Sequence, residues 1–131
     1  NTGGYVSELL LDKLLRKPLG LRVPREGGPS VFPAHSLRSA KATVLLIDSG
    51  SCSDAEALAD SFREHGLGPI VGVRTWGGVL SVGELDIELV DGGSVSIPSD
   101  NMFSLAGGAF ALENRGVAPD IEVDIPPDWA P

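Results

Sequence analysis

The chain has 131 residues, of which 42% are hydrophobic, and a formal net charge of −8 from 10 Lys plus Arg against 18 Asp plus Glu. This length is typical of one domain, so we predict a single domain over residues 1–131. The acidic balance argues against a nucleic-acid partner, because binding a phosphate backbone needs clustered basic side chains. The single cysteine, Cys52, excludes an intrachain disulfide framework and a cysteine-rich zinc site. No apolar run approaches the roughly 20 residues of a membrane-spanning helix, so membrane insertion is not expected.

The first third of the chain predicts a helix followed by an irregular loop. Residues 5–16, "YVSELLLDKLLR", have leucines at helical spacing with charges between them, and Pro18 ends the pattern. The preceding "NTGG" is typical of a glycine turn that leads into the helix. Residues 18–42 contain four prolines and three glycines, and we expect an irregular excursion there. Such long loops usually carry function or pack against a partner.

The middle of the chain predicts a βαβ unit. Residues 42–50, "ATVLLIDSG", have the continuous apolar run of a strand buried on both faces. A helix is expected from about Asp54 to His65, with Gly66 as its C-terminal cap. Residues 68–75, "GPIVGVRT", predict a second buried strand. A strand, a helix and another strand form a right-handed parallel unit in nearly all proteins.

The last part predicts a β-hairpin and an extended tail. Residues 79–99 alternate as a hairpin does, with Asp91, Gly92 and Gly93 at its turn. A short strand is expected near residues 107–116, "GGAFALENRG". In the tail, acidic and aliphatic residues alternate over 120–123, which is typical of an edge strand. The predicted fold class is therefore one α/β layered domain.

A run of small polar residues, "SCSD" at 51–54, begins the second predicted helix. A serine there can cap the helix, and Ser51 with Asp54 has the spacing of a capping arrangement. The same position suits acyl transfer, because helix N-termini offer free amides to an oxyanion beside an oxygen nucleophile. The amides of Gly3 and Gly4 would face the same place if the strand before "NTGG" neighbours the strand at 44–48. Both interpretations stay open on these residues alone.

Four segments, taken together, resemble the tail-specific protease superfamily (peptidase family S41). They are "NTGG", "VLLIDSGSCSDAEALADSF", "LGPIVGVRTWGGVLSVG" and "LENRGVAPDIEVDIPP", in this order. The similarity is greatest to the C-terminal catalytic core of the tricorn-type branch. It implies a crotonase/ClpP-like layered α/β fold with βαβ units, here incomplete at the N-terminus. It also implies peptide hydrolysis by a serine nucleophile, with no cofactor and no metal.

The resemblance assigns roles to five residues. Ser53 matches the nucleophile, and the backbone amide of Asp54 matches one oxyanion donor. A glycine of the first turn would be the other donor, and we favour Gly4 over Gly3. Glu113 matches the acidic residue that orients the catalytic histidine through an intervening serine.

Substrate contacts are expected at three further residues. Glu26 matches an acidic loop residue that, in the tricorn branch, shapes a preference for basic side chains. Trp76 and Gly77 would line a substrate groove, with an aromatic core plug as the equal alternative for Trp76. The expected substrates are peptides or unfolded protein segments. We expect a cytoplasmic protein. The first residue is Asn rather than Met, so we expect a fragment, a processed product or part of a longer chain. The long apolar strands and the missing first strand suggest a homo-oligomer or a longer chain.

The catalytic base is expected from outside this chain. The Ser–Lys branch of the family would place its lysine where this chain has Gly78, so that mechanism is not expected. The tricorn branch supplies a histidine from upstream of the glycine turn, and the chain alone would then be inactive. His65 lies roughly 18 Å along the helix from the serine and is interpreted as a dipole partner. His35 is interpreted as a surface or packing residue, and Cys52 as a small buried hydrophobe rather than a thiol nucleophile.

Two other functions compete with the peptidase hypothesis. A non-catalytic domain of the same fold could bind a ligand or peptide, as some relatives with a stretch like residues 77–83 do. A crotonase-type enzyme could use converging amides to polarise an acyl thioester. The presence of Ser53, Asp54 and Glu113 together favours the peptidase.

Overall fold

The computed structural model describes residues 3–17, 19–32, 43–82, 85–100 and 112–124. Its helices and strands follow in this order: α1 (Ser7–Leu15), β1 (Gly20–Arg22), β2 (Ser30–Phe32), β3 (Leu45–Ile47), α2 (Asp54–Glu64), β4 (Ile70–Gly72), β5 (Leu85–Glu88), β6 (Ser94–Ile97) and β7 (Ile121–Glu122). Helix α1 confirms the helix expected at 5–16, and α2 confirms the one expected from Asp54.

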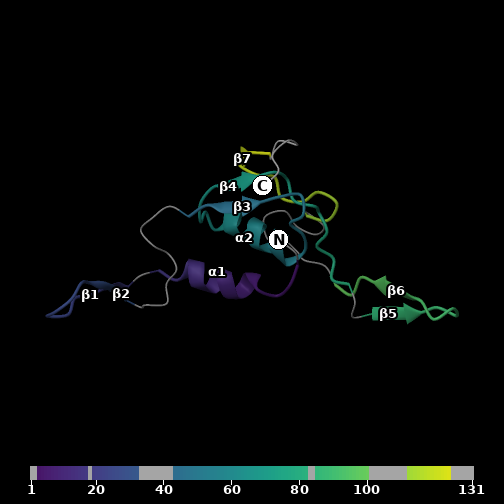
Figure 1. Cartoon of the computed structure of the whole chain (residues 1–131), viewed down its shortest axis with the longest axis horizontal. Coiled ribbons are helices and arrows are strands. Elements are labelled where there is room, and N and C mark those ends of the chain that lie inside the picture. Colours follow the sequence, from purple (N-terminus) through teal and green to yellow (C-terminus); the bar gives the residue numbers. More distant parts are fainter. Residues whose placement is uncertain (1–2, 18, 33–42, 83–84, 101–111, 125–131) are drawn as a thin grey trace, which may run out of the picture.

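The centre of the fold is a parallel sheet of β3, β4 and β7, in the order β3-β4-β7. Leu45 pairs with Ile70 between β3 and β4, and Val71 pairs with Ile121 between β4 and β7. Helix α2 connects β3 to β4 and lies against the sheet, with α1 on its other side (Figure 1). The predicted βαβ unit is therefore confirmed, and β7 is the expected edge strand.

The hydrophobic core lies between α2 and the sheet. Phe62 and Ala59 of α2 pack there against side chains from the sheet and from the loops that follow it. The buried cluster comprises Ile47, Ala59, Phe62, Ile70, Val79, Leu112 and Val117, with Leu14, Leu45 and Leu67 packed against it. Leu14 brings α1 to this core, whereas Leu9, Leu10 and Leu15 of the same helix are exposed.

The expectation that the strand at 42–50 is buried on both faces is wrong for β3. Ile47 is buried, whereas the neighbouring Leu46 is 72% exposed. Successive side chains of a strand point to opposite faces, and in the described part of the chain α2 covers only one of them. Ile121 of β7 is also exposed, so aliphatic side chains line the uncovered part of the sheet.

Helix α2 ends as its sequence predicts. His65 is the C-cap, and Gly66 follows it with a φ of +57°. The amide of Gly66 donates to the carbonyl of Arg63 at 2.9 Å, and the amide of Leu67 donates to that of Phe62 at 3.1 Å. This pair of bonds is a Schellman motif, which satisfies carbonyls at the helix end.

Two antiparallel hairpins extend from the βαβ unit on opposite sides (Figure 1). Strands β5 and β6 confirm the predicted hairpin, with the Asp91 carboxylate accepting the Gly93 amide at its turn at 3.0 Å. Strands β1 and β2 form a second hairpin within residues 18–42, where an irregular loop was expected. Each has three residues, which is too short for an alternating pattern to stand out among the prolines.

Residues 112–116 form a turn rather than the short strand expected near 107–116, whose other residues lie outside the described ranges. Within those ranges, neither helix has the length and hydropathy that crossing a membrane requires.

Candidate active site

The loop from β3 to α2 uses Ser51 and Ser53 in different ways. Ser51 is buried, and its hydroxyl accepts the Asp48 amide at 3.1 Å and contacts the Asp48 carboxylate at 3.2 Å. The hydroxyl of Ser51 is therefore engaged in its own turn. The expected cap from Ser51 to Asp54 is wrong, because the N-cap of α2 is Ser53.

Ser53 has a backbone conformation that non-glycine residues rarely adopt, with φ 53° and ψ −122°. Its amide donates to the carbonyl of Gly78 at 2.8 Å and to the carboxylate of Glu56 at 3.2 Å. Ser53 and Glu56 form the capping box of α2, in which the Glu56 carboxylate accepts the Ser53 amide. Strained residues of this kind occur at functional sites where surrounding contacts hold them.

The first glycine turn lies directly against Ser53. A Cβ atom on Gly3 would lie 2.6 Å from the Ser53 Cβ, 2.9 Å from its Oγ and 3.9 Å from the Asp54 amide nitrogen. A Cβ atom on Gly4 would meet nothing within 4 Å. In the part of the chain that the structure describes, the amides of Gly3, Gly4 and Asp54 have no hydrogen-bond acceptor. Gly3 of this turn therefore lies against the Ser53 side chain, beside the start of α2.

Glu56 is the buried centre of the site, and the sequence analysis did not single it out. Its carboxylate is 0% exposed and accepts the Thr75 hydroxyl at 2.6 Å. It also accepts the amides of Gly77 at 2.7 Å and Gly78 at 2.8 Å. It also accepts the Ser53 amide, so the Glu56 carboxylate joins the candidate nucleophile to the loop after β4. The spacing Ser-x-x-Glu at 53–56 is the capping-box signal that could have identified it.

The loop at 75–78 packs tightly on the turn at 112–117. Gly77 has a φ of +90°, and a Cβ atom there would lie 2.8 Å from the Arg115 amide nitrogen. Its carbonyl accepts the Asn114 amide at 2.7 Å, and the Thr75 hydroxyl accepts the Val117 amide at 2.7 Å. Gly77 thus has a packing role, because no side chain fits between the two segments.

Glu113 lies in that turn and faces the same loop. Its half-buried carboxylate accepts the amides of Val79 at 2.9 Å and Leu80 at 3.2 Å. Residues 78–80 therefore connect Glu113 to Ser53. Val79 and Leu80 donate to Glu113, and the neighbouring Gly78 carbonyl accepts the Ser53 amide. The structure brings these two candidate residues into one hydrogen-bonded framework.

Trp76 is 70% exposed, which excludes a role as a core plug. Its amide donates to the carbonyl of Ser51 at 3.0 Å, so the backbone joins the loop that leads into α2. The indole lies over Gly78, where a Cβ atom would be 2.8 Å from the ring.

Other predicted residues lie apart from this framework. Glu26 is exposed in the turn between β1 and β2, and that hairpin extends away from α2 (Figure 1). His65 caps the opposite end of α2 from Ser53, and His35 is outside the described residues. Cys52 is half-buried rather than buried. Among the described residues, no group of three or more His, Cys, Asp or Glu side chains could hold a metal ion.

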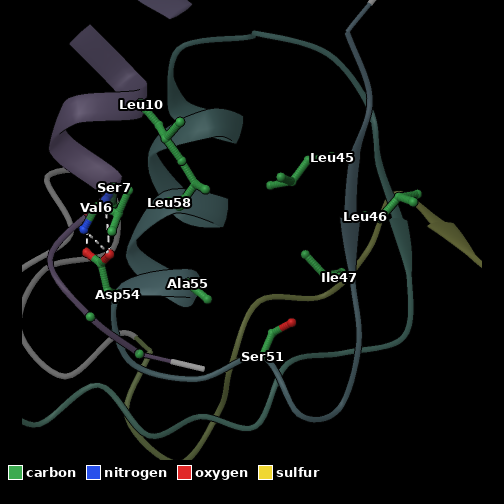
Figure 2. A pocket seen from close by; sticks show the side chains of 12 residues that line it. Val6, Ser7, Leu10, Leu45, Leu46, Ile47, Ser51, Asp54, Ala55 and Leu58 are labelled. Carbon is green, nitrogen blue, oxygen red and sulfur yellow. Dashed lines mark hydrogen bonds between the residues drawn. The ribbon is translucent and has the colours of Figure 1, made fainter. Parts of the chain in front are cut away.

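A pocket of about 230 Å³ lies beside the glycine turn, between β3 and the two helices (Figure 2). Gly3, Gly4 and Asp54 line one end of it. Apolar side chains line the rest, with Leu10 and Leu58 from the helices and Leu45 and Ile47 from β3. This end of the site can therefore accept an apolar group next to the free amides.

Comparisons with known proteins agree with this geometry. A family model described as peptidase family S41 matches residues 1–123. The tricorn protease homolog of Saccharolobus solfataricus is 40% identical over 128 residues, which are 98% of this chain and 12% of that protein. The crystal structure of the tricorn protease matches with a TM-score of 0.81 and 35% identity, over 93% of this chain and 12% of that chain.

A second solved structure, the photosystem II D1 C-terminal processing protease, matches with a TM-score of 0.64 and 28% identity. It covers 95% of this chain and 32% of that chain. The α/β fold is thus the fold of S41 proteases, and the chain spans 12% of the length of the tricorn protease of Thermoplasma acidophilum. The chain belongs to peptidase family S41 and resembles the tricorn proteases over nearly its whole length.

Proposed function

We propose that this chain is the core of a serine peptidase that cleaves peptide bonds with Ser53 as nucleophile. The observation that carries the proposal is the meeting of the Ser53 side chain with Gly3 and the Asp54 amide. An enzyme of this type needs an oxygen nucleophile next to preorganised donors that bind the oxyanion of the tetrahedral intermediate. The strained Ser53 backbone, held by Gly78 and Glu56, supports the same assignment.

In the proposed reaction, the Ser53 hydroxyl attacks the carbonyl carbon of the scissile peptide while a base takes its proton. The carbonyl oxygen becomes an oxyanion bound by the amide of Asp54 and one amide of the glycine turn, for which we favour Gly4. Collapse of this intermediate releases the amine, which takes the proton from the base, and water then hydrolyses the acyl-enzyme. Glu113 steadies that base, which comes from outside this chain.

The proposed substrates are peptides or unfolded segments that lie across the loop at 75–78. The exposed indole of Trp76 offers an apolar surface beside the site, and Gly77 keeps the loop flat against its neighbour. Glu26 and the net charge of −8 support a preference for basic side chains. Assembly into an oligomer would be the means of bringing the β1–β2 hairpin to a substrate.

The test is covalent labelling of the full-length protein by a fluorophosphonate, together with hydrolysis of a fluorogenic peptide. Ser53→Ala is expected to abolish labelling and to lower kcat/KM about a thousandfold or more. Ser49→Ala is the matched control, because Ser49 is exposed two residues before the buried Ser51, and it should keep both signals. Labelling that survives Ser53→Ala would assign the nucleophile elsewhere.

The isolated chain of 131 residues provides a second test, because the proposal places the base outside it. We expect peptide turnover by this segment to be negligible while its fold is retained. Efficient hydrolysis by the segment alone would contradict the external base.

A second candidate function is non-catalytic binding of an apolar ligand, which the pocket between β3 and the helices favours. In that case Leu58→Trp, which fills the pocket, would abolish binding of a fluorescent apolar probe, whereas Ser53→Ala would leave binding unchanged. A protein that binds the probe but never reacts with a fluorophosphonate would favour this function over the peptidase.

A further inference from the structure

The side chain of Asp54 points away from α2 and holds the start of α1. Its carboxylate accepts the Val6 amide at 2.8 Å and the Ser7 amide at 2.9 Å, and it also accepts the Ser7 hydroxyl (Figure 2). These bonds connect residues 47 and 48 positions apart in the sequence. The first residue of one helix therefore caps the other helix.

Helix α1 has no cap of its own. Its N-cap is Val6, which makes no side-chain cap hydrogen bond, and the amides of a helix N-terminus need acceptors. Ser7 is the residue of α1 that is buried, at 6% exposure, so water reaches its groups poorly. A carboxylate at this end also interacts favourably with the helix dipole. The Asp54 carboxylate supplies both the acceptors and the charge.

The position of this contact relates it to the site. Val6 follows the glycine turn after a single intervening residue, Tyr5, and Gly3 touches the Ser53 side chain. The Asp54 carboxylate joins the start of α1, directly after this turn, to the start of α2. Any drift of α1 away from α2 would carry the turn away from Ser53.

We propose that Asp54 is a positioning residue that sets the distance between the two oxyanion donors. This inference rests on the proposed peptidase function. The backbone amide of Asp54 is one donor, and its carboxylate holds the turn that bears the other. The carboxylate oxygens are engaged by three donors of α1, so we assign this side chain a positioning role and no proton transfer.

The experiment compares Asp54→Ala, Asp54→Asn and Ser7→Ala in the full-length protein, with Asp60→Asn as the matched control on the same helix. We call the hydrogen bonds from the Asp54 carboxylate to Val6 and Ser7 the clamp. Hydrogen exchange of the amides at residues 3–7 reports on this clamp independently of activity. Peptide hydrolysis and affinity for a peptide aldehyde report on the oxyanion donors, because the aldehyde adduct carries the same oxyanion.

For Asp54→Ala we expect faster exchange at residues 3–7 and a kcat about tenfold to a hundredfold lower, because small misplacements of donors are costly. KM should change less than about threefold, and aldehyde affinity should fall in parallel with kcat. Asp54→Asn and Ser7→Ala should show smaller losses of the same kind, and Asp60→Asn none. A purely structural role would not move aldehyde affinity and kcat together at constant KM.

Two results would overturn the inference. Unchanged exchange at residues 3–7 in Asp54→Ala would show that there is no clamp. Faster exchange with an unchanged kcat would show that the clamp does not position the donors. Failure of the proposed function has a different signature, since the unaltered protein would then neither react with a fluorophosphonate nor cleave peptide. In that event the positioning role falls with it, and the exchange data still decide whether the clamp exists.

Discussion

Two carboxylates in the first turn of α2 hold the two sides of the candidate site, and their surroundings differ. Glu56 points inward, is fully buried, and accepts four donors from Ser53 and the loop at 75–78. Asp54 points outward, is half-buried, and accepts three donors from Val6 and Ser7. One carboxylate therefore holds Ser53 from within the core, and the other holds the glycine turn from the surface.

Because their surroundings differ, the two carboxylates are expected to affect different properties, namely the stability of the fold and the accuracy of the site geometry. Removing one partner of a buried hydrogen bond lowers the free energy of unfolding more than the same change at the surface. At the surface, water replaces the missing partner. The Glu56 side is therefore expected to determine whether the site forms at all. The Asp54 side is expected to determine how accurately its two turns meet. The following predictions test this division.

The largest effect is expected for Glu56→Ala. This change leaves the Thr75 hydroxyl and the amides of Gly77 and Gly78 buried without their acceptor, and each such group costs about 1–3 kcal/mol. We expect the free energy of unfolding to fall by about 3–5 kcal/mol, measured by urea denaturation. Glu8→Ala, an exposed position in α1, should change it by about 0.5 kcal/mol or less. Equal losses for the two variants would contradict the role of Glu56 in stabilising the fold.

Gly77→Ala should have the next largest effect. The added Cβ would require a φ of +90° and would meet the Arg115 amide nitrogen at 2.8 Å, so both strain and overlap arise. We expect a loss of about 2–4 kcal/mol in thermal or urea unfolding. Gly66→Ala is the matched control, because its φ is +57° with open space around it, and it should cost about 1 kcal/mol. A Gly77 variant no worse than the Gly66 variant would argue against tight packing on residues 112–117.

Ser7→Ala tests the stability of the outer side. It removes one hydrogen bond to Asp54 while the two backbone amides keep theirs. The expected loss in urea unfolding is about 1 kcal/mol, the usual value of one such bond. A loss as large as that of Glu56→Ala would show that the outer side is as important for stability as the inner one.

The smallest effect is expected for Asp120, an exposed carboxylate of the β7 edge that also accepts a backbone amide. The Ile70 amide, at 2.8 Å, lowers the pKa of Asp120, and the guanidinium of Arg63 lowers it further. Because its pKa is lower in the folded state, its contribution is present above the unfolded pKa of about 4 and is lost as pH falls through the folded value. Asp120→Asn should therefore reduce the pH dependence of unfolding only below about pH 4. A change confined to neutral pH would contradict this assignment.

The hairpin of β1 and β2 shows where sequence patterns fail. Its strands are three residues long, too short to show an alternating pattern, and they are recognised only by their pairing with each other. In contrast, the hairpin of β5 and β6 was predictable because Asp91 and the two following glycines mark its turn. The exposed outer side of β3 was also missed, since an apolar run does not tell how many layers cover a sheet.

By itself the sequence determined the local elements: α1, α2 with its glycine end, and the βαβ order. These depend on residue periodicity and on turn residues, which act over a few positions. Only the tertiary structure decided that Gly3 touches Ser53, that Glu56 binds the loop at 75–78, and that Asp54 caps α1. Those contacts join residues about 20 to 50 positions apart. They depend on how the helices pack on the sheet, and no local pattern encodes that packing.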